Sequence, residues 1–201
     1  MKQSETPLRR SEISRNTRET RISVVLNLDG SGRCDCATGV GFFDHMLDHL
    51  ARHGMLDLTV KAAGDLHIDA HHTVEDVSLV LGSAIQQALG DKRGIYRYGW
   101  AGVPMEDTLA NVALDLSGRP AFVFNARFPT PKIGDFDVEL VHESLRSLAN
   151  TAGMNLHVNV PYGTNSHHIA EAIFKALAKS LRQAVAIDPR SHEIPSTKGV
   201  L

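Results

Sequence analysis

The chain has 201 residues, of which 42% are hydrophobic and 22% charged, and its formal net charge is −2. Such a composition is typical of an ordinary folded protein, and the near-neutral charge excludes the broad basic surface on which proteins bind nucleic acid. No apolar run approaches the ~20 residues that span a bilayer, and the first residues carry no apolar signal segment. The sequence therefore predicts a cytoplasmic protein with no membrane or nucleic-acid partner.

The first elements expected along the chain are strands. The N-terminal 17 residues or so are polar and are expected to be loose, with residues 1–8 flexible. Apolar residues alternate over 22–28, which predicts a half-buried strand. A turn at 29–32 and a second strand to about residue 38 follow.

A helix, a strand and a second helix come next. Phe43, Met46, Leu47 and Leu50 form a helical stripe, and Gly54 stands where a glycine commonly caps a helix end. Alternation over 56–60 predicts a strand. The side chain of Asp69 is expected to cap a long helix whose apolar stripe runs over 74–88.

The second half of the chain repeats this order. The sequence predicts strands near 110–117 and 120–127, a helix near 136–151, a strand near 154–160 and a helix near 167–186. The pattern β-β-α-β-α, present twice, predicts an α+β fold with mixed sheets and helices packed on one face.

Sequence matches between the halves indicate an internal duplication. Leu28-Asp29 and Ser31-Gly32-Arg33 match Leu114-Asp115 and Ser117-Gly118-Arg119, 86 positions later, while other matches have offsets of 96 and 98. We expect a first half at 9–94, a second half at 95–188 and a C-terminal tail at 189–201.

The most specific repeated feature is His-His-x-x-Glu, which occurs at 71–75 and again at 167–171. Imidazole and carboxylate are the donors that hold divalent metals. On a helix either histidine of a motif can share one ion with its glutamate, whereas adjacent histidines diverge by about 100° and can serve two ions. The repeat thus predicts a two-metal site or two metal sites per chain.

His45 is a candidate third ligand for the first motif, because it lies on the polar face of the helix predicted around Phe43. The offset of 98 places Glu143 at the corresponding position of the second half, with His142 beside it. Glu143 is our first choice as a ligand there and His142 the alternative.

The tail places two hydroxyls and an ammonium in a row at Ser196, Thr197 and Lys198. Such a segment can wrap an anion with backbone N–H groups, hydroxyls and a point charge. Arg97, Arg119 and Lys175 are further cationic residues, and each taken alone fits a solvated surface position equally well.

Together these motifs resemble imidazoleglycerol-phosphate dehydratase, a hydro-lyase of histidine biosynthesis. The resemblance rests on the segments 41–47, 69–76, 165–176 and 194–201, and it runs from about residue 8 to the C-terminus. It implies two similar α+β halves, metal-dependent dehydration of imidazole glycerol phosphate to imidazole acetol phosphate, and a homo-oligomeric shell of 24 subunits with active sites where subunits meet.

The resemblance also implies roles for individual residues. Two manganese ions would be held by His45, His71, His72, Glu75, Glu143, His167, His168 and Glu171. The substrate phosphate would be bound by Arg97, Arg119, Lys175, Ser196 and Lys198, with Thr197 beside them. Glu19 would contact the substrate, and Glu19 and Glu171 are the candidates for proton transfer, of which Glu19 is favoured because metal ligation weakens a carboxylate as a base. A dinuclear metallohydrolase and a non-enzymatic metal-binding shell are the alternative readings of the same donor set.

Overall fold

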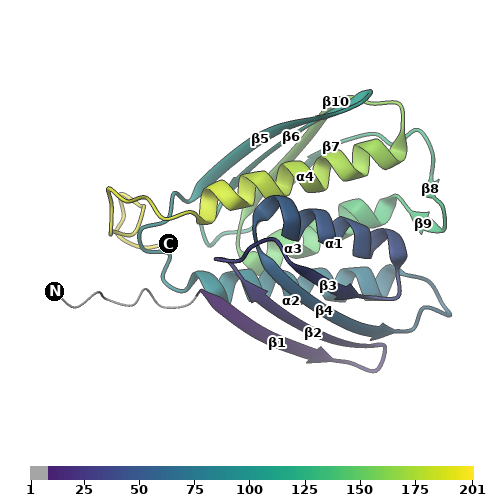
Figure 1. Ribbon diagram of the computed structural model, residues 1–201, viewed down its shortest axis with the longest axis horizontal. Helices are drawn as coiled ribbons and strands as arrows, with labels where there is room; N and C mark the ends of the chain where they lie inside the picture. The colour runs from purple at the N-terminus through teal and green to yellow at the C-terminus, as the bar shows by residue number, and fades with distance from the viewer. Residues whose placement is uncertain (1–8) are drawn as a thin grey trace.

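Four helices are enclosed between two four-stranded sheets in the computed structural model, which describes residues 9–201 (Figure 1). The elements follow the chain in the order β1 (Arg10–Asn16), β2 (Thr20–Asn27), β3 (Cys34–Ala37), α1 (Gly41–Gly54), β4 (Asp57–Gly64), α2 (His71–Leu89), β5 (Tyr98–Met105), β6 (Thr108–Asp115), β7 (Ala121–Asn125), β8 (Lys132–Ile133), β9 (Phe136–Asp137), α3 (Glu139–Ala152), β10 (Asn155–Tyr162) and α4 (Ser166–Val185).

The two large sheets have the same topology. Their strand orders are β1-β2-β4-β3 and β5-β6-β10-β7. In each sheet the first three strands of that order pair antiparallel, and the last strand pairs parallel to its neighbour. The predicted α+β duplication with mixed sheets is therefore confirmed, and a small β8–β9 hairpin is an addition to the second half.

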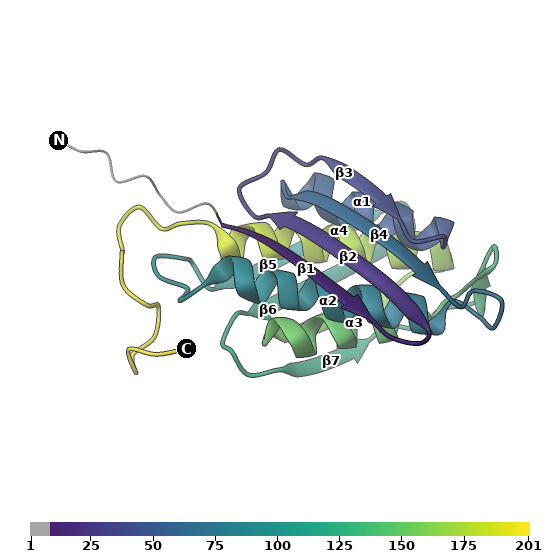
Figure 2. The same cartoon turned by 90° about the horizontal axis from the view of Figure 1, so that it is seen from below.

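Each sheet has helices on one face only, as the sequence predicted. Helix α2 packs on β1 and β2, while α4 packs on β5 and β6. Across the middle of the molecule, α2 lies against α3 and α1 lies against α4 (Figures 1 and 2). The apolar stripes of all four helices and the inner faces of both sheets form one continuous core. Helices of different halves are thus in direct contact.

Each half begins with one strand more than the sequence pattern predicted. The expectation of a loose segment is wrong for 10–16, which forms edge strand β1; residues 1–8 lie outside the described residues. Strand β1 has no apolar alternation, and backbone pairing with β2 holds it, together with a hydrogen bond from the Ser11 hydroxyl to the carbonyl of Ala84 (2.8 Å).

Strand β5 was not predicted from the sequence, for a different reason. Its inner positions carry small residues such as Gly99 and Ala101, while Tyr98 and Trp100 point outward. A Cβ at Gly99 would collide with the backbone carbonyl of Ser180 in α4, so the close approach of helix and strand excludes a larger side chain there. The usual signature of apolar residues inside and polar residues outside is therefore missing from this strand.

Strand register corrects one of the sequence matches between the halves. Leu26 pairs with Leu58, and Leu114 pairs with Leu156. Because Leu58 and Leu156 are equivalent, the strand counterpart of Leu114 is Leu26 and not Leu28. The offset between β2 and β6 is therefore 88 (114 − 26).

The end of α1 also differs from expectation by one residue. Gly54 is the last, buried residue of the helix, and Met55 adopts the left-handed conformation with φ 56°. In the second half the left-handed residue is Gly153, with φ 63°. The same chain reversal is thus made with methionine in one half and glycine in the other.

Candidate metal centres

Both His-His-x-x-Glu motifs lie in the first turns of long helices, at the same end of the molecule. The sequence predicted Asp69 as the N-cap of α2, but the N-cap is Ala70; Asp69, one residue earlier, accepts a hydrogen bond from the backbone N–H of His71 (2.8 Å). Asn165 does the same for His167 (2.9 Å) and His168 (3.3 Å) in α4. These caps satisfy N–H groups that have no partner within a helix, and they fix the first turn that carries the histidines.

The first cluster joins α2 to α3. One donor atom each from His71, Glu75 and Glu143 lie within 4.8 Å of one another. Partial burial favours the neutral form of Glu143, but the guanidinium of Arg146 outweighs it and holds the pKa of this carboxyl below its usual value. The cluster is therefore anionic, and a positive charge already lies against it.

The second cluster joins α4 to α1. One Glu171 oxygen lies 3.2 Å from His45 Nε2 and 3.0 Å from His167 Nε2. Burial works against the charged form of Glu171, but the Lys175 ammonium, the neighbouring His49 and the His167 side chain lower its pKa to about 2. Glu171 is therefore an anion held among cationic and imidazole groups.

The helix pairing corrects the expectation that His45 completes the first motif. His45 groups with His167 and Glu171 of the second motif, and Glu143 groups with His71 and Glu75 of the first. The reason is that α1 packs on α4 while α3 packs on α2. Each cluster therefore combines a motif from one half with a ligand candidate from the other.

Glu143 and His142 occupy different surroundings. Glu143 faces His71 and Glu75, whereas the His142 ring packs against Phe122 and Phe124, with ring centroids 5.1 and 5.2 Å away. Because adjacent helical residues point about 100° apart, only one of the two can face the cluster. The structure brings Glu143 there.

The second histidine of each motif turns away from its own cluster. His72 Nδ1 lies 2.9 Å from an oxygen of Asp65, and His168 Nδ1 lies 2.6 Å from an oxygen of Asp107. Glu19, at the tip of the β1–β2 hairpin, lies beside His72, with its nearer oxygen 3.9 Å from Nδ1. Glu19, Asp65 and His72 form a third group of potential ligands.

The donor chemistry of these clusters fits a divalent metal. Imidazole nitrogens and carboxylate oxygens suit Mn²⁺ and related ions. Neighbouring donors in an octahedral shell at ~2.1 Å from the ion lie about 3 Å apart. The separations of 3.0 and 3.2 Å in the second cluster match this spacing. The first cluster is wider, with 4.0 Å between His71 and Glu75.

The candidate phosphate-binding residues do not all lie in one place. Arg97 makes a two-pronged ion pair with Asp115 and donates to the carbonyl of Pro195 in the tail (2.9 Å). The tail therefore folds back on Arg97. It also returns to the loop that carries Arg119, because a Cβ at Gly118 would lie 3.3 Å from the backbone of Leu201.

Lys175 lies elsewhere, with its ammonium 2.5 Å from a carboxylate oxygen of Glu171. The Arg97 backbone is hydrogen-bonded to Ala184, which follows Glu171 by 13 residues of α4. At 1.5 Å per helical residue, Arg97 and the metal candidates are thus separated by about 20 Å. The tail and the motifs lie at opposite ends of the helical layer (Figure 1).

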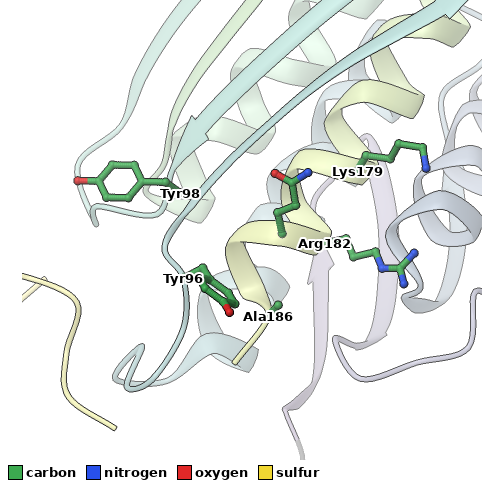
Figure 3. A pocket seen from close by; sticks show the side chains of 6 residues that line it. Tyr96, Tyr98, Lys179, Arg182 and Ala186 are labelled. Atoms are coloured by element: carbon green, nitrogen blue, oxygen red, sulfur yellow. The ribbon is translucent and has the colours of Figure 1, made fainter. Parts of the chain in front are cut away.

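Two surface hollows differ in their relation to the clusters. A hollow of about 840 Å³ includes His45, Phe42, Asp69 and the β8–β9 hairpin in its lining, and so opens beside the second cluster. Another, of about 700 Å³, lies between β5 and the end of α4. In this second hollow Tyr98 points one way and Lys179 and Arg182 the opposite way, so its polar groups do not converge on a ligand (Figure 3).

Several residues at these clusters were missed from the sequence. Asp65 and Asp107 contact motif histidines, and His49 Nε2 lies 3.2 Å from both His45 Nε2 and a Glu171 oxygen. A signal existed for Asp107, since the corrected offset of 88 makes it the counterpart of Glu19. Asp65 lies in the loop before α2, where the sequence holds no such signal.

Comparison with known proteins decides the family. A model of the imidazoleglycerol-phosphate dehydratase family matches residues 38–181, which include both motifs. The chain belongs to the imidazoleglycerol-phosphate dehydratase family. It therefore has the family's activity, the hydro-lyase reaction that dehydrates imidazole glycerol phosphate in histidine biosynthesis.

Relatives in this dehydratase family match nearly the whole chain. The imidazoleglycerol-phosphate dehydratase of Cereibacter sphaeroides is 60% identical over 195 residues, covering 96% of this chain and 100% of the relative. That of Azorhizobium caulinodans is 59% identical over the same length, covering 96% and 99%.

Solved dehydratase structures share the fold. The crystal structure from Staphylococcus aureus subsp. aureus N315 superposes with a TM-score of 0.82 at 36% identity, covering 89% of this chain and 99% of that one. The Pyrococcus furiosus structure, a complex with (S)-C348, gives 0.81 at 32% identity, covering 94% and 100%. Among residues 9–201, no helix is both long and apolar enough to cross a membrane.

Proposed function

We propose that this dehydratase works with two Mn²⁺ ions per active site in the cytoplasm. The ligands would be His45, His71, His72, Glu75, Glu143, His167, His168 and Glu171. The observation that carries the proposal is the composition of the two clusters. Each groups the first histidine and the glutamate of one motif with one ligand candidate of the other half. Imidazole and carboxylate donors brought together from four helices suit a divalent cation.

The active site is proposed to form between chains of a homo-oligomer, a shell of 24 subunits. Two features support assembly. Each of the two clusters offers three donors, and His72 and His168, which are also proposed ligands, lie outside them. The phosphate candidates around Arg97 also lie about 20 Å from the clusters along α4, farther than one small substrate reaches. A neighbouring chain would supply what each end lacks.

The chain's own residues divide the work of dehydration. When bound, the two divalent ions would supply Lewis acidity that lowers the N–H pKa of the substrate ring. Glu19 is the proposed proton-transfer group, because its side chain is 56% exposed and, among residues 9–201, makes no hydrogen bond; its nearer oxygen lies 3.9 Å from His72 Nδ1. Glu171 is a poor base, since its pKa lies near 2. A positioned acid–base group contributes about 10²–10⁴-fold to the rate.

Substrate orientation is assigned to the cationic groups. The substrate phosphate is proposed to be held by Arg97, Arg119, Lys175, Ser196, Thr197 and Lys198. Fixing the far end of the substrate contributes orientation, and it disfavours the unphosphorylated analogue, which would leave these cations unpaired.

Metal analysis combined with a dehydration assay tests the proposal. The purified protein, His72→Ala and Glu19→Gln are compared for bound Mn²⁺ and for imidazole acetol phosphate formed. We expect His72→Ala to lose metal and activity together, and Glu19→Gln to keep its metal and lose at least about 10²-fold in rate.

Three outcomes would contradict the proposal. Full activity of Glu19→Gln would remove its role in proton transfer. Full metal content and activity of His72→Ala would remove this histidine from the metal centre. Release of inorganic phosphate in place of the dehydrated product would indicate a hydrolase.

A further inference from the structure

The duplication gives Glu19 a structural counterpart in the second half, Asp107. Each residue ends a hairpin tip and directly precedes a buried threonine, Thr20 or Thr108, that begins the next strand. The strand offset of 88 fixed by the leucine pairs relates Glu19 to Asp107 as well (107 − 19). The two carboxylates thus occupy equivalent positions in the two halves.

In the second half this carboxylate is fully engaged. One oxygen of Asp107 lies 2.6 Å from His168 Nδ1. The other accepts hydrogen bonds from the backbone N–H and hydroxyl of Thr164 (both 2.5 Å) and from the N–H of Asn165 (3.0 Å). Four donors therefore converge on Asp107, and the side chain has no freedom to reach a substrate.

In the first half a different residue contacts the corresponding histidine. Asp65, whose side chain is 10% exposed, places an oxygen 2.9 Å from His72 Nδ1. Glu19 lies 3.9 Å from the same nitrogen and is 56% exposed. The position that binds the histidine in one half is therefore disengaged in the other, and a nearby aspartate has taken its place.

A carboxylate on one ring nitrogen determines what the other nitrogen can do. It holds the proton on Nδ1, so that Nε2 carries the lone pair and becomes the donor to a metal, and it fixes the ring plane. Removing such a partner weakens metal binding by about 10–100-fold in metalloproteins.

We propose that Asp107 and Asp65 are positioning residues that make Nε2 of His168 and His72 the metal donors, and that Asp65 frees Glu19 for proton transfer. The inference rests on the proposed function, because it takes His72 and His168 as ligands and Glu19 as the proton-transfer group. It assigns different tasks to two equivalent carboxylates.

The test measures the Mn²⁺ affinity of the full-length protein directly, by titrating chelator-treated protein with Mn²⁺ and following free Mn²⁺ by electron paramagnetic resonance. Asp107→Asn and Asp65→Asn are each expected to weaken binding at the affected site by about 10–100-fold. Asp107→Ala should weaken it further, because asparagine retains an oxygen that accepts from Nδ1–H and alanine does not. Glu19→Gln should leave the affinity within about twofold, and it should lower kcat alone.

A matched control distinguishes a direct effect of Asp107 on His168 from an indirect effect through the structure of the loop that carries Thr164. Thr164→Val removes a hydrogen bond to Asp107 without touching His168, and it is expected to keep wild-type Mn²⁺ affinity. If Thr164→Val weakened Mn²⁺ binding as much as Asp107→Asn, the aspartate would act by holding the loop. If Glu19→Gln weakened binding as much as Asp65→Asn, the division of tasks would be wrong.

Failure of the inference and failure of the proposed function give different results. His168→Ala with unchanged Mn²⁺ affinity would remove His168 as a ligand and so overturn the proposed function. His168→Ala with lost affinity and Asp107→Asn with unchanged affinity would keep the ligand and overturn only the positioning role.

Discussion

Met55 occupies a backbone conformation that its side chain disfavours. Its φ of 56° is the left-handed region, which costs a residue other than glycine about 1–2 kcal/mol. The counterpart, Gly153, adopts φ 63° without that cost. The first half therefore carries backbone strain at this helix end, whereas the equivalent position of the second half does not.

We expect Met55→Gly to stabilise the protein by about 0.5–1 kcal/mol, because relief of strain exceeds the extra chain entropy that glycine loses on folding. The measurement is the urea midpoint at fixed protein concentration. The reverse change, Gly153→Ala, should lower the midpoint. A lower midpoint for Met55→Gly would mean that packing of the methionine outweighs the strain.

Glu143 and His142 offer a second comparison at the scale of single residues. We expect Glu143→Gln to weaken Mn²⁺ binding by on the order of tenfold or more, since it removes a charged donor beside His71 and Glu75. His142→Leu should keep the metal, because its ring packs against Phe122 and Phe124. Equilibrium dialysis with metal analysis checks both, and metal loss in His142→Leu alone would reverse the assignment.

Side-chain hydrogen bonds hold the turn before β3 to β4, and different ones hold the equivalent turn before β7 to β10. In the first half, Asp57 accepts from the Ser31 backbone and hydroxyl and from Arg33. In the second half the uncharged Asn155 takes the place of Asp57, and it donates hydrogen bonds to the Ser117 hydroxyl and to the Arg119 carbonyl. Hydrogen bonds from Arg33 and Ser31 hold the pKa of Asp57 well below its usual value.

This element should therefore make stability depend on pH through Asp57. A carboxyl whose folded pKa is depressed stabilises the fold above its unfolded pKa of about 3.9, and that contribution is lost as pH falls below it. We expect Asp57→Asn to be less stable than the wild type at pH 6, with the difference shrinking towards pH 3. Urea midpoints at both values test this. An equal difference at both pH values would argue against an electrostatic cause.

At the scale of the whole molecule, metal binding and assembly are expected to be coupled. His72 and His168, two of the proposed ligands, lie outside both clusters of their own chain, so a bound ion is expected to join donors of different chains. We expect chelation to shift the oligomer towards smaller species and added Mn²⁺ to restore it, as followed by multi-angle light scattering. A full-size assembly after complete metal removal would show that protein contacts suffice.

Much of this protein could be predicted from local sequence. The repeated motif at 71–75 and 167–171, the apolar stripes of the four helices and the alternation in β2 are all short-range patterns, and they gave the duplicated α+β class and the metal-type donors. Such patterns are readable because helix and strand periodicities determine which face a residue occupies. Strands β1 and β5 lack them and escaped prediction.

Only the tertiary structure decided which donors meet. His45 groups with His167 because α1 packs on α4, a contact between halves that no spacing within one half encodes. The same holds for Asp65 and Asp107, whose partners are determined by loop geometry and strand register. Residue types and their periodicity specify the elements and the available chemistry, whereas pairing depends on how side chains of distant segments fill a common core.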